Sequence, residues 1–100
     1  MQEFLYKLQL VRGDMLRAGM SEQEQAVVAE HFAYLSDLAA KGVIILVGRT
    51  LTTDENTMGL TIFCAESEAD AREIMNGDPA VKKGVMTATL YPFKVVLQGK

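Results

Sequence analysis

Residues 21–48 read SEQEQAVVAEHFAYLSDLAAKGVIILVG, and they hold the longest helix signal, the clearest helix end and the most apolar strand of the chain. Ser21 and Glu24 form a capping-box pattern, in which each side chain satisfies a backbone N–H of the other residue. Gly42 predicts the helix end, because glycine readily takes the left-handed conformation just past a last helical turn. Apolar residues between them recur at helical spacing: Val28, Phe32, Leu35 and Ala39, with Val27 and Leu38 widening the stripe.

The run Val43–Val47 that follows this helix is apolar at every position and rich in β-branched residues. Such a run predicts a strand with apolar side chains on both faces, and such a strand needs cover on both faces. One layer of helices can cover only one of them. The other face therefore needs a different cover.

Alternating apolar residues, caps and turn residues divide the remaining chain into further elements. Strands are expected over 4–11, 43–51, 58–65 and 85–97, a second helix over 67–77, and a short helical turn over 79–83. Pro92 cannot donate a ladder hydrogen bond, so it marks an edge, a bulge or a strand that changes partners. The order strand, helix, strand, strand, helix, strand predicts one α+β domain over residues 1–100. Its fold would be a ferredoxin-like sandwich, with both helices on one face of a four-stranded antiparallel sheet.

Two apolar surfaces of this predicted fold lack an obvious cover. The connection Met15–Met20 is apolar for a loop, which favours packing against its own domain or a neighbour over a flap above a pocket. The sheet face without helices would carry Leu5, half of 43–47, and either Met86, Ala88 and Leu90 or their alternates. A second copy of the same sheet is the simplest cover, so we expect a homodimer.

Composition excludes several classes of partner. The chain of 100 residues is 49% hydrophobic, with a net charge of −3 and no basic block. Nucleic acid and membrane surfaces are therefore not expected partners, and no apolar run approaches the roughly 20 residues of a membrane span. Residues 1–10 lack the pattern of a signal peptide, and the single cysteine, Cys64, fits a reducing cytoplasm. We expect neither a metal nor a cofactor, because one histidine gives no ligand cluster and no phosphate loop is found.

The one histidine, His31, and Asp78 are the candidates for chemistry. His31 is predicted on the flank of the first helix, and Asp78 at the end of the second, so the two could meet in a cleft. A carboxylate beside an imidazole fixes the tautomer of the ring and stabilises its protonated form, as in general acid–base pairs. The alternative is structural, with a hydrogen-bonded histidine at the core boundary and an aspartate that caps the helix begun by Pro79.

Four short motifs follow one another along nearly the whole chain: Glu30-His31-Phe32-x-Tyr34-Leu35, Ala40-Lys41-Gly42-x-Ile44-x-x-x-Gly48, Asp78-Pro79-Ala80-x-x-x-Gly84-Val85 and Pro92-Phe93. Their order and spacing resemble the YciI-like (YCII-related) family. The resemblance implies a dimeric α+β barrel related in fold to muconolactone isomerases, with His31 and Asp78 as the proposed active-site pair. The family's activity is largely undefined. One departure is Gly48-Arg49 where the family often has Gly-Pro, and this arginine could contact an anion or point into water.

Two functions remain open. The first is a small isomerase- or lyase-like enzyme that uses His31 with Asp78 for proton transfer on a small polar or anionic molecule, held by Arg12 and Arg49. The alternative is a non-catalytic dimeric module that binds a ligand or a partner protein through the same cleft. The two differ in whether His31 faces a cavity with room for a substrate. The identity of the small-molecule ligand does not follow from the sequence.

Overall fold

The computed structural model describes residues 1–12 and 19–99 of the chain. Its elements in chain order are β1 (Gln2–Leu10), α2 (Glu22–Ala40), β2 (Ile44–Arg49), β3 (Met58–Ala65), α3 (Glu68–Gly77), α4 (Pro79–Lys82) and β4 (Met86–Phe93). This order confirms the predicted ferredoxin-like α+β fold. Of the apolar connection expected before α2, residues 15–18 lie outside the described residues, whereas Met20 packs beside Val27 and Val85.

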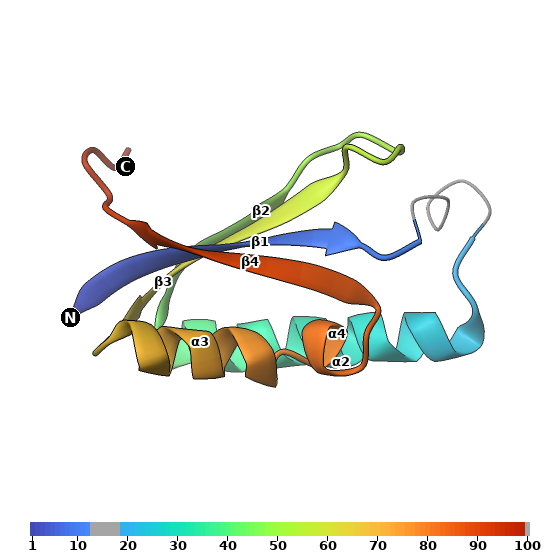
Figure 1. Cartoon of the computed structure of the whole chain (residues 1–100), viewed down its shortest axis with the longest axis horizontal. Helices are drawn as coiled ribbons and strands as arrows, with labels where there is room; N and C mark the ends of the chain where they lie inside the picture. Colours follow the sequence, from blue (N-terminus) through green and yellow to red (C-terminus); the bar gives the residue numbers. More distant parts are fainter. Residues whose placement is uncertain (13–18, 100) are drawn as a thin grey trace.

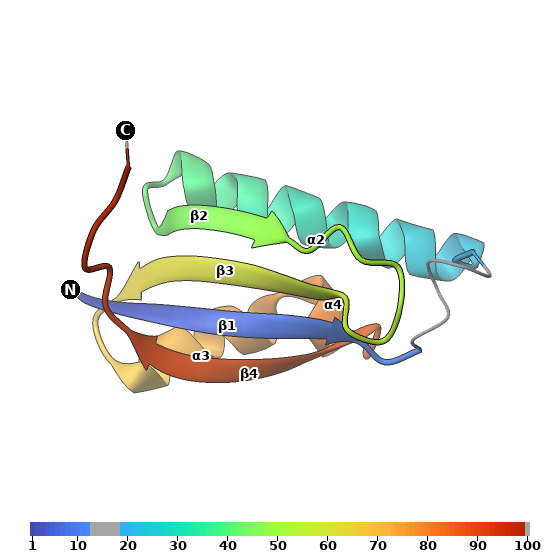
Figure 2. The ribbon, with the colours of Figure 1, turned by 90° about the horizontal axis from the view of Figure 1, so that it is seen from above.

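The four strands form one antiparallel sheet in the order β2-β3-β1-β4. The three described helices lie below this sheet, and its upper face carries none of them (Figure 1). Seen from above, α2 runs along the β2 side of the sheet, while α3 lies beneath β1 and β4 (Figure 2). None of the described helices is long and apolar enough to cross a membrane.

The register of β1 separates a covered face from an open one. Phe4, Tyr6 and Leu8 point toward the helices and are buried, with the ring of Phe63 edge-on to that of Tyr6 at 5.5 Å. On β4, the residues opposite this row are Pro92, Leu90 and Ala88, and Met86 pairs with Leu10, the next residue of the row. Met86, Ala88 and Leu90 therefore belong to the covered face, and their alternates belong to the open one.

The open face carries an apolar patch around Leu5, as the two-sided strand pattern predicts, although Lys7 and Thr89 also lie on this face. Leu5 pairs with Ile62 on one side and Tyr91 on the other, and Ile62 pairs in turn with Leu46. Leu46, Tyr91 and Phe93 are exposed large hydrophobic side chains. A contiguous apolar surface of this kind is unusual for a face that stays in water.

The buried face of α2 differs from the predicted stripe. Val27 and Leu35 are buried, but Phe32 is 71% exposed and Ala39 is exposed as well. Val27 packs against Val85, and Leu35 packs in the main core, so these two contacts set the rotation of the helix. His31 lies four residues from each, near the middle of the packed face rather than on its flank.

The predicted ends of α2 are confirmed by their hydrogen bonds. The backbone N–H of Glu24 donates to Ser21 Oγ at 3.1 Å, and the N–H of Ser21 donates to Glu24 Oε1 at 2.8 Å. Gly42 has φ of +78°, the left-handed conformation expected just past the helix.

Two strand boundaries were predicted too long. β4 ends at Phe93 rather than at residue 97, because Phe93 pairs with Glu3 and β1 begins at Gln2, so little ladder remains beyond it. β4 lies at an edge of the sheet, where Pro92 is tolerated, so of the three alternatives given for this residue the edge is the one observed. β2 is also shorter than 43–51, and its pairing is irregular between Ile44 and Leu46.

Gly77 is the last residue of α3, as predicted, although its φ is not positive. The helix ends because Asp78 is extended ahead of Pro79, a residue that disfavours helical geometry in the residue before it. Gly77 instead provides space for Tyr34. A Cβ at position 77 would lie 2.9 Å from the Tyr34 hydroxyl, which donates to the Ile74 carbonyl at 2.7 Å.

We expect Gly77→Ala to destabilise the protein by about 1–2 kcal/mol through overpacking. In a helix the same change usually stabilises by roughly 0.5–1 kcal/mol, so the contact with Tyr34 should reverse the sign. In a Tyr34→Phe background the nearest ring atom is Cζ, 3.6 Å from the added carbon, an ordinary contact. There Gly77→Ala should stabilise. Urea unfolding of the four proteins measures both effects, and equal effects in the two backgrounds would contradict this role of Gly77.

Candidate functional site

The covered side of the sheet brings His31 of α2 against Asp78, which joins α3 to α4. His31 Nδ1 lies 2.7 Å from Asp78 Oδ1 and 2.8 Å from Oδ2. The Asp78 side chain is fully buried, and that of His31 is 14% exposed. The predicted contact between His31 and Asp78 is therefore present.

The Asp78 carboxylate has partners on three elements: His31 of α2, Tyr6 of β1 and Ala80 of α4. Its Oδ1 accepts from the backbone N–H of Ala80 at 3.0 Å, and its Oδ2 accepts from the Tyr6 hydroxyl of β1 at 2.9 Å. The aspartate thus caps α4, as the structural alternative proposed, and contacts the histidine as well. A buried carboxylate needs such donors, because burial without them would be costly.

Tyr6 is the residue of this cluster that the sequence analysis missed. It was read as one member of the apolar row of β1, and it is fully buried. A buried tyrosine hydroxyl usually has a hydrogen-bond partner. A tyrosine within an otherwise apolar row was therefore the signal that could have indicated a polar group nearby. Burial raises the pKa of Tyr6 well above its ordinary value, the Asp78 charge and hydrogen bond add to the rise, and the nearby Thr61 hydroxyl opposes it. Tyr6 therefore stays protonated and serves as a donor.

The contact with Asp78 assigns the tautomer of His31. A carboxylate only accepts hydrogen bonds, so Nδ1 must carry the hydrogen in the neutral ring. Nε2 is then left with a lone pair, on a ring that lines a cavity. Such a nitrogen can take a proton from a bound molecule and return it, while Asp78 stabilises the charged ring.

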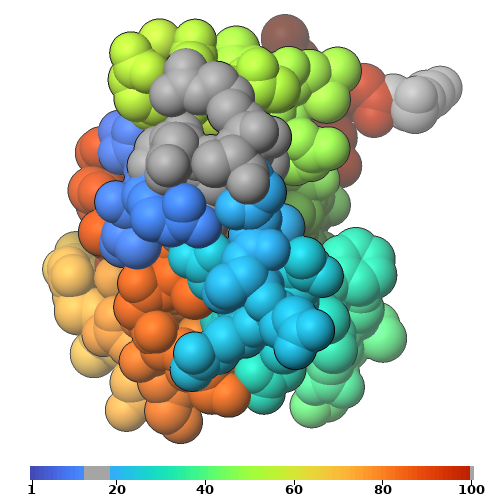
Figure 3. Space-filling view, turned by 90° about the vertical axis from the view of Figure 1, so that its right-hand side faces the viewer, coloured from blue at the N-terminus to red at the C-terminus, as the bar shows by residue number. Residues whose placement is uncertain are grey.

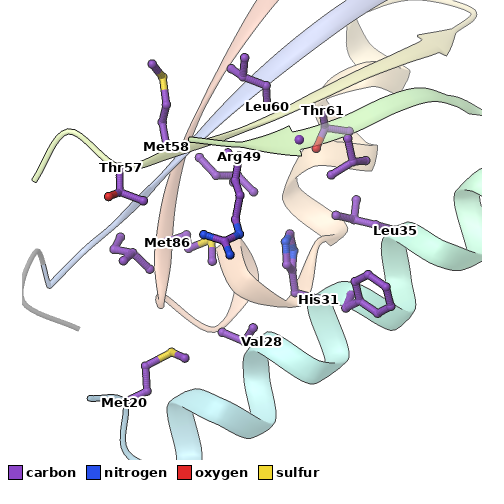
Figure 4. Close-up of a pocket in the computed structure, with 16 residues that line it drawn as sticks. Met20, Val28, His31, Leu35, Arg49, Thr57, Met58, Leu60, Thr61 and Met86 are labelled. Atoms are coloured by element: carbon purple, nitrogen blue, oxygen red, sulfur yellow. The ribbon is translucent and has the colours of Figure 1, made fainter. Parts of the chain in front are cut away.

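The cavity lies between α2 and the ends of β2 and β3 and has a volume of about 530 Å³, within the range of small-molecule pockets. His31 and Leu35 rise from α2 on one side, and Thr61 and Arg49 come from the strands on the other (Figure 4). Most of the lining is apolar, with Leu8, Val28, Leu35, Val47 and Met86 among it. The β2–β3 connection and the beginning of α2 lie at the same end of the molecule (Figure 3).

The two candidate arginines lie in different surroundings. Arg49 pairs with Gly59 in the sheet and lines the cavity. Arg12 is not part of the cavity lining. It donates to Glu24 Oε1 at 2.7 Å and to the Gly19 carbonyl at 3.3 Å, and its hydrogen bond lowers the pKa of Glu24. Arg49 is thus the arginine that shares the cavity with His31. Among the described residues, no group of three His, Cys, Asp or Glu side chains could hold a metal ion.

The fold and the His31–Asp78 contact define a ferredoxin-like α+β domain with a histidine–aspartate pair beside a cavity. The YCII-related domain matches residues 8–94, so the chain belongs to the YCII-related family. No curated protein sequence matches it.

Two solved structures share the fold. One is 5-chloro-2-hydroxyhydroquinone dehydrochlorinase (TftG) from Burkholderia phenoliruptrix AC1100 in complex with 2,5-dihydroxybenzoquinone. It is 24% identical with a TM-score of 0.65, and the match covers 91% of this chain and 93% of that chain. The other is SnoaB, a cofactor-independent oxygenase from Streptomyces nogalater. It is 9% identical with a TM-score of 0.53, and the match covers 98% of this chain and 97% of that chain. At these identities the likeness shows the fold.

Proposed function

We propose that this protein is a small isomerase- or lyase-like enzyme, in which His31 transfers a proton on a small anionic molecule. The observation that carries the proposal is the contact of His31 Nδ1 with the buried Asp78, on a ring that also lines the cavity. That arrangement makes Nε2 the reactive nitrogen and gives the imidazolium a nearby counter-charge.

In the proposed reaction, Nε2 accepts a proton from an acidic C–H or O–H of the bound molecule. The electron pair left behind is delocalised onto an oxygen, whose negative charge Arg49 stabilises. In an isomerisation, the imidazolium returns the proton to a different atom. In an elimination, the electron pair forms a new double bond, the leaving group departs with its own bonding pair, and the imidazolium releases its proton to the leaving group or to water. Asp78 is a positioning residue in both cases, because it touches the ring and not the substrate.

Two enzymes with this fold support the enzymatic reading over the binding module. One is named a dehydrochlorinase, which denotes the loss of hydrogen chloride, an elimination. The other is described as a cofactor-independent oxygenase, which supports chemistry by side chains on this fold. The reaction class proposed here needs only His31, Asp78 and Arg49 from this chain.

The function is tested with two kinds of compound. Chloride release is measured with 5-chloro-2-hydroxyhydroquinone, and deuterium uptake from D₂O is followed by proton NMR with pyruvate and oxaloacetate. We expect at least one compound to react faster with the protein than in buffer, and Arg49→Met to lower that rate. Rates equal to buffer with every compound would contradict the enzyme and leave the non-catalytic binding module.

We also propose that two copies associate through the open sheet face, around Leu5, Ile62 and Tyr91. The exposed hydrophobic side chains on this face are the support. A stable dimer should bury roughly 1,500 Å² or more. We expect a dimer at micromolar concentration in sedimentation equilibrium. Tyr91→Lys should shift the equilibrium toward monomer, whereas Arg72→Glu on exposed α3 should not. A wild-type monomer would contradict the assembly.

A further inference from the structure

Thr61 carries an unused polar group at the cavity. It lies near the middle of β3, opposite Tyr6 of β1 and Val47 of β2, and it is 1% exposed. Its Oγ1 is buried and meets no partner at hydrogen-bonding geometry within the described part of the chain, although it interacts with the Tyr6 hydroxyl closely enough to lower the pKa of Tyr6. Buried hydroxyls without a partner are rare in native proteins and need an explanation. Because Thr61 also lines the cavity, a bound molecule could supply that partner.

The part of the cavity formed by β3 has no side chain beside Thr61, because the residue there is Gly59; we call this the bare wall of the cavity. Gly59 lies two residues before Thr61 on the same face of β3, opposite Leu8. A Cβ added at Gly59 would meet the Gly48 carbonyl at 3.7 Å and Leu8 side-chain atoms at 3.8 and 4.0 Å, all ordinary contacts. A side chain would fit there, and its absence leaves peptide backbone that a flat group can approach closely.

Arg49 of β2 places a positive charge in the cavity near the Thr61 hydroxyl. Arg49 pairs with Gly59, and Val47 pairs with Thr61, so Arg49 and Thr61 are diagonal neighbours about 7–8 Å apart at the backbone. The Arg49 side chain makes no hydrogen bond or ion pair with any described residue. Figure 4 shows the guanidinium, the His31 ring and Thr61 around the same space.

We infer that the cavity binds a planar conjugated oxyanion of the hydroxyquinone or phenolate class, with one ring oxygen at Arg49 and another at Thr61. The ring would lie over Gly59 and contact the apolar side chains of Leu8, Leu35 and Met86. A short aliphatic dianion such as succinate could contact Arg49, but it has little apolar surface to set against this lining. Binding of this ring by Arg49, Thr61 and Gly59 does not depend on the proposed function. Only the exchange of a proton between His31 and the bound ring rests on it.

Calorimetric titration tests the ligand class, with 2,5-dihydroxybenzoquinone as the planar probe and succinate as the aliphatic one. We expect the planar probe to bind the wild type at least tenfold more tightly. Thr61→Val keeps the shape and removes the hydroxyl, so it should weaken the planar probe about tenfold. The same variant should melt at an unchanged or higher temperature, because no internal hydrogen bond of good geometry is lost.

Gly59→Val places a β-branched side chain on the bare wall, where the strand tolerates it, and should abolish binding of the planar probe. Equal binding of the two probes, unchanged affinity in Thr61→Val, or a lower melting temperature of Thr61→Val would each overturn the inference. Binding of the planar probe without turnover of any compound would support the inference and reject the proposed function. Turnover confined to aliphatic acids would support the function and reject the inference.

Discussion

Asp78→Ala is expected to lower the free energy of unfolding by about 3–5 kcal/mol, the usual cost of breaking a buried charged contact. The change leaves three donors without their acceptor: the Tyr6 hydroxyl, the backbone N–H of Ala80, and Nδ1–H of His31. Tyr6 is fully buried, so water cannot replace the lost partner there. Urea unfolding followed by circular dichroism measures the loss.

Asp37→Ala is the matched control for this substitution. Asp37 also pairs with a basic side chain, Lys41 at 2.8 Å, but its side chain is 61% exposed. Exposed pairs of this spacing contribute about 0.3–0.5 kcal/mol, so the control should be nearly neutral. If Asp78→Ala costs no more than Asp37→Ala, then the carboxylate does not hold β1, α2 and α4 together.

His31→Gln is expected to lower turnover of a reacting compound by about 10²–10⁴-fold, the usual contribution of a general acid–base group. Glutamine can occupy the same space and donate to Asp78, yet it has no lone pair of comparable basicity to accept the proton. The loss should fall on kcat with little change in KM, because the proton transfer takes place in the transition state. Initial rates with the wild type and the variant measure both constants.

Glu30→Gln is the control for His31→Gln. Glu30 is adjacent in the chain, but it is half exposed and pairs with Lys83 at 2.8 Å on the outside of the molecule. Its rates should equal those of the wild type. Turnover that survives His31→Gln would assign the chemistry to another group and leave His31 a structural role.

The sequence alone determined the elements and their order. Caps and turns act within a few residues, so Ser21 with Glu24, and Gly42 with its positive φ, were found where the local pattern placed them. Alternation identified the buried row Phe4, Tyr6 and Leu8 for the same reason. The predicted pairing of His31 and Asp78 needed one further step, since it depended on both helices sharing a sheet face.

The tertiary structure decided how those elements face one another. The rotation of α2, which exposes Phe32 and turns His31 inward, depends on distant packing partners such as Val85. The hydrogen bond between Tyr6 and Asp78 joins residues 72 apart in the chain, and the bare wall at Gly59 beside Thr61 depends on strand register. Local propensities carry no information about such contacts, because each is set by the packing of segments that the chain brings together only on folding.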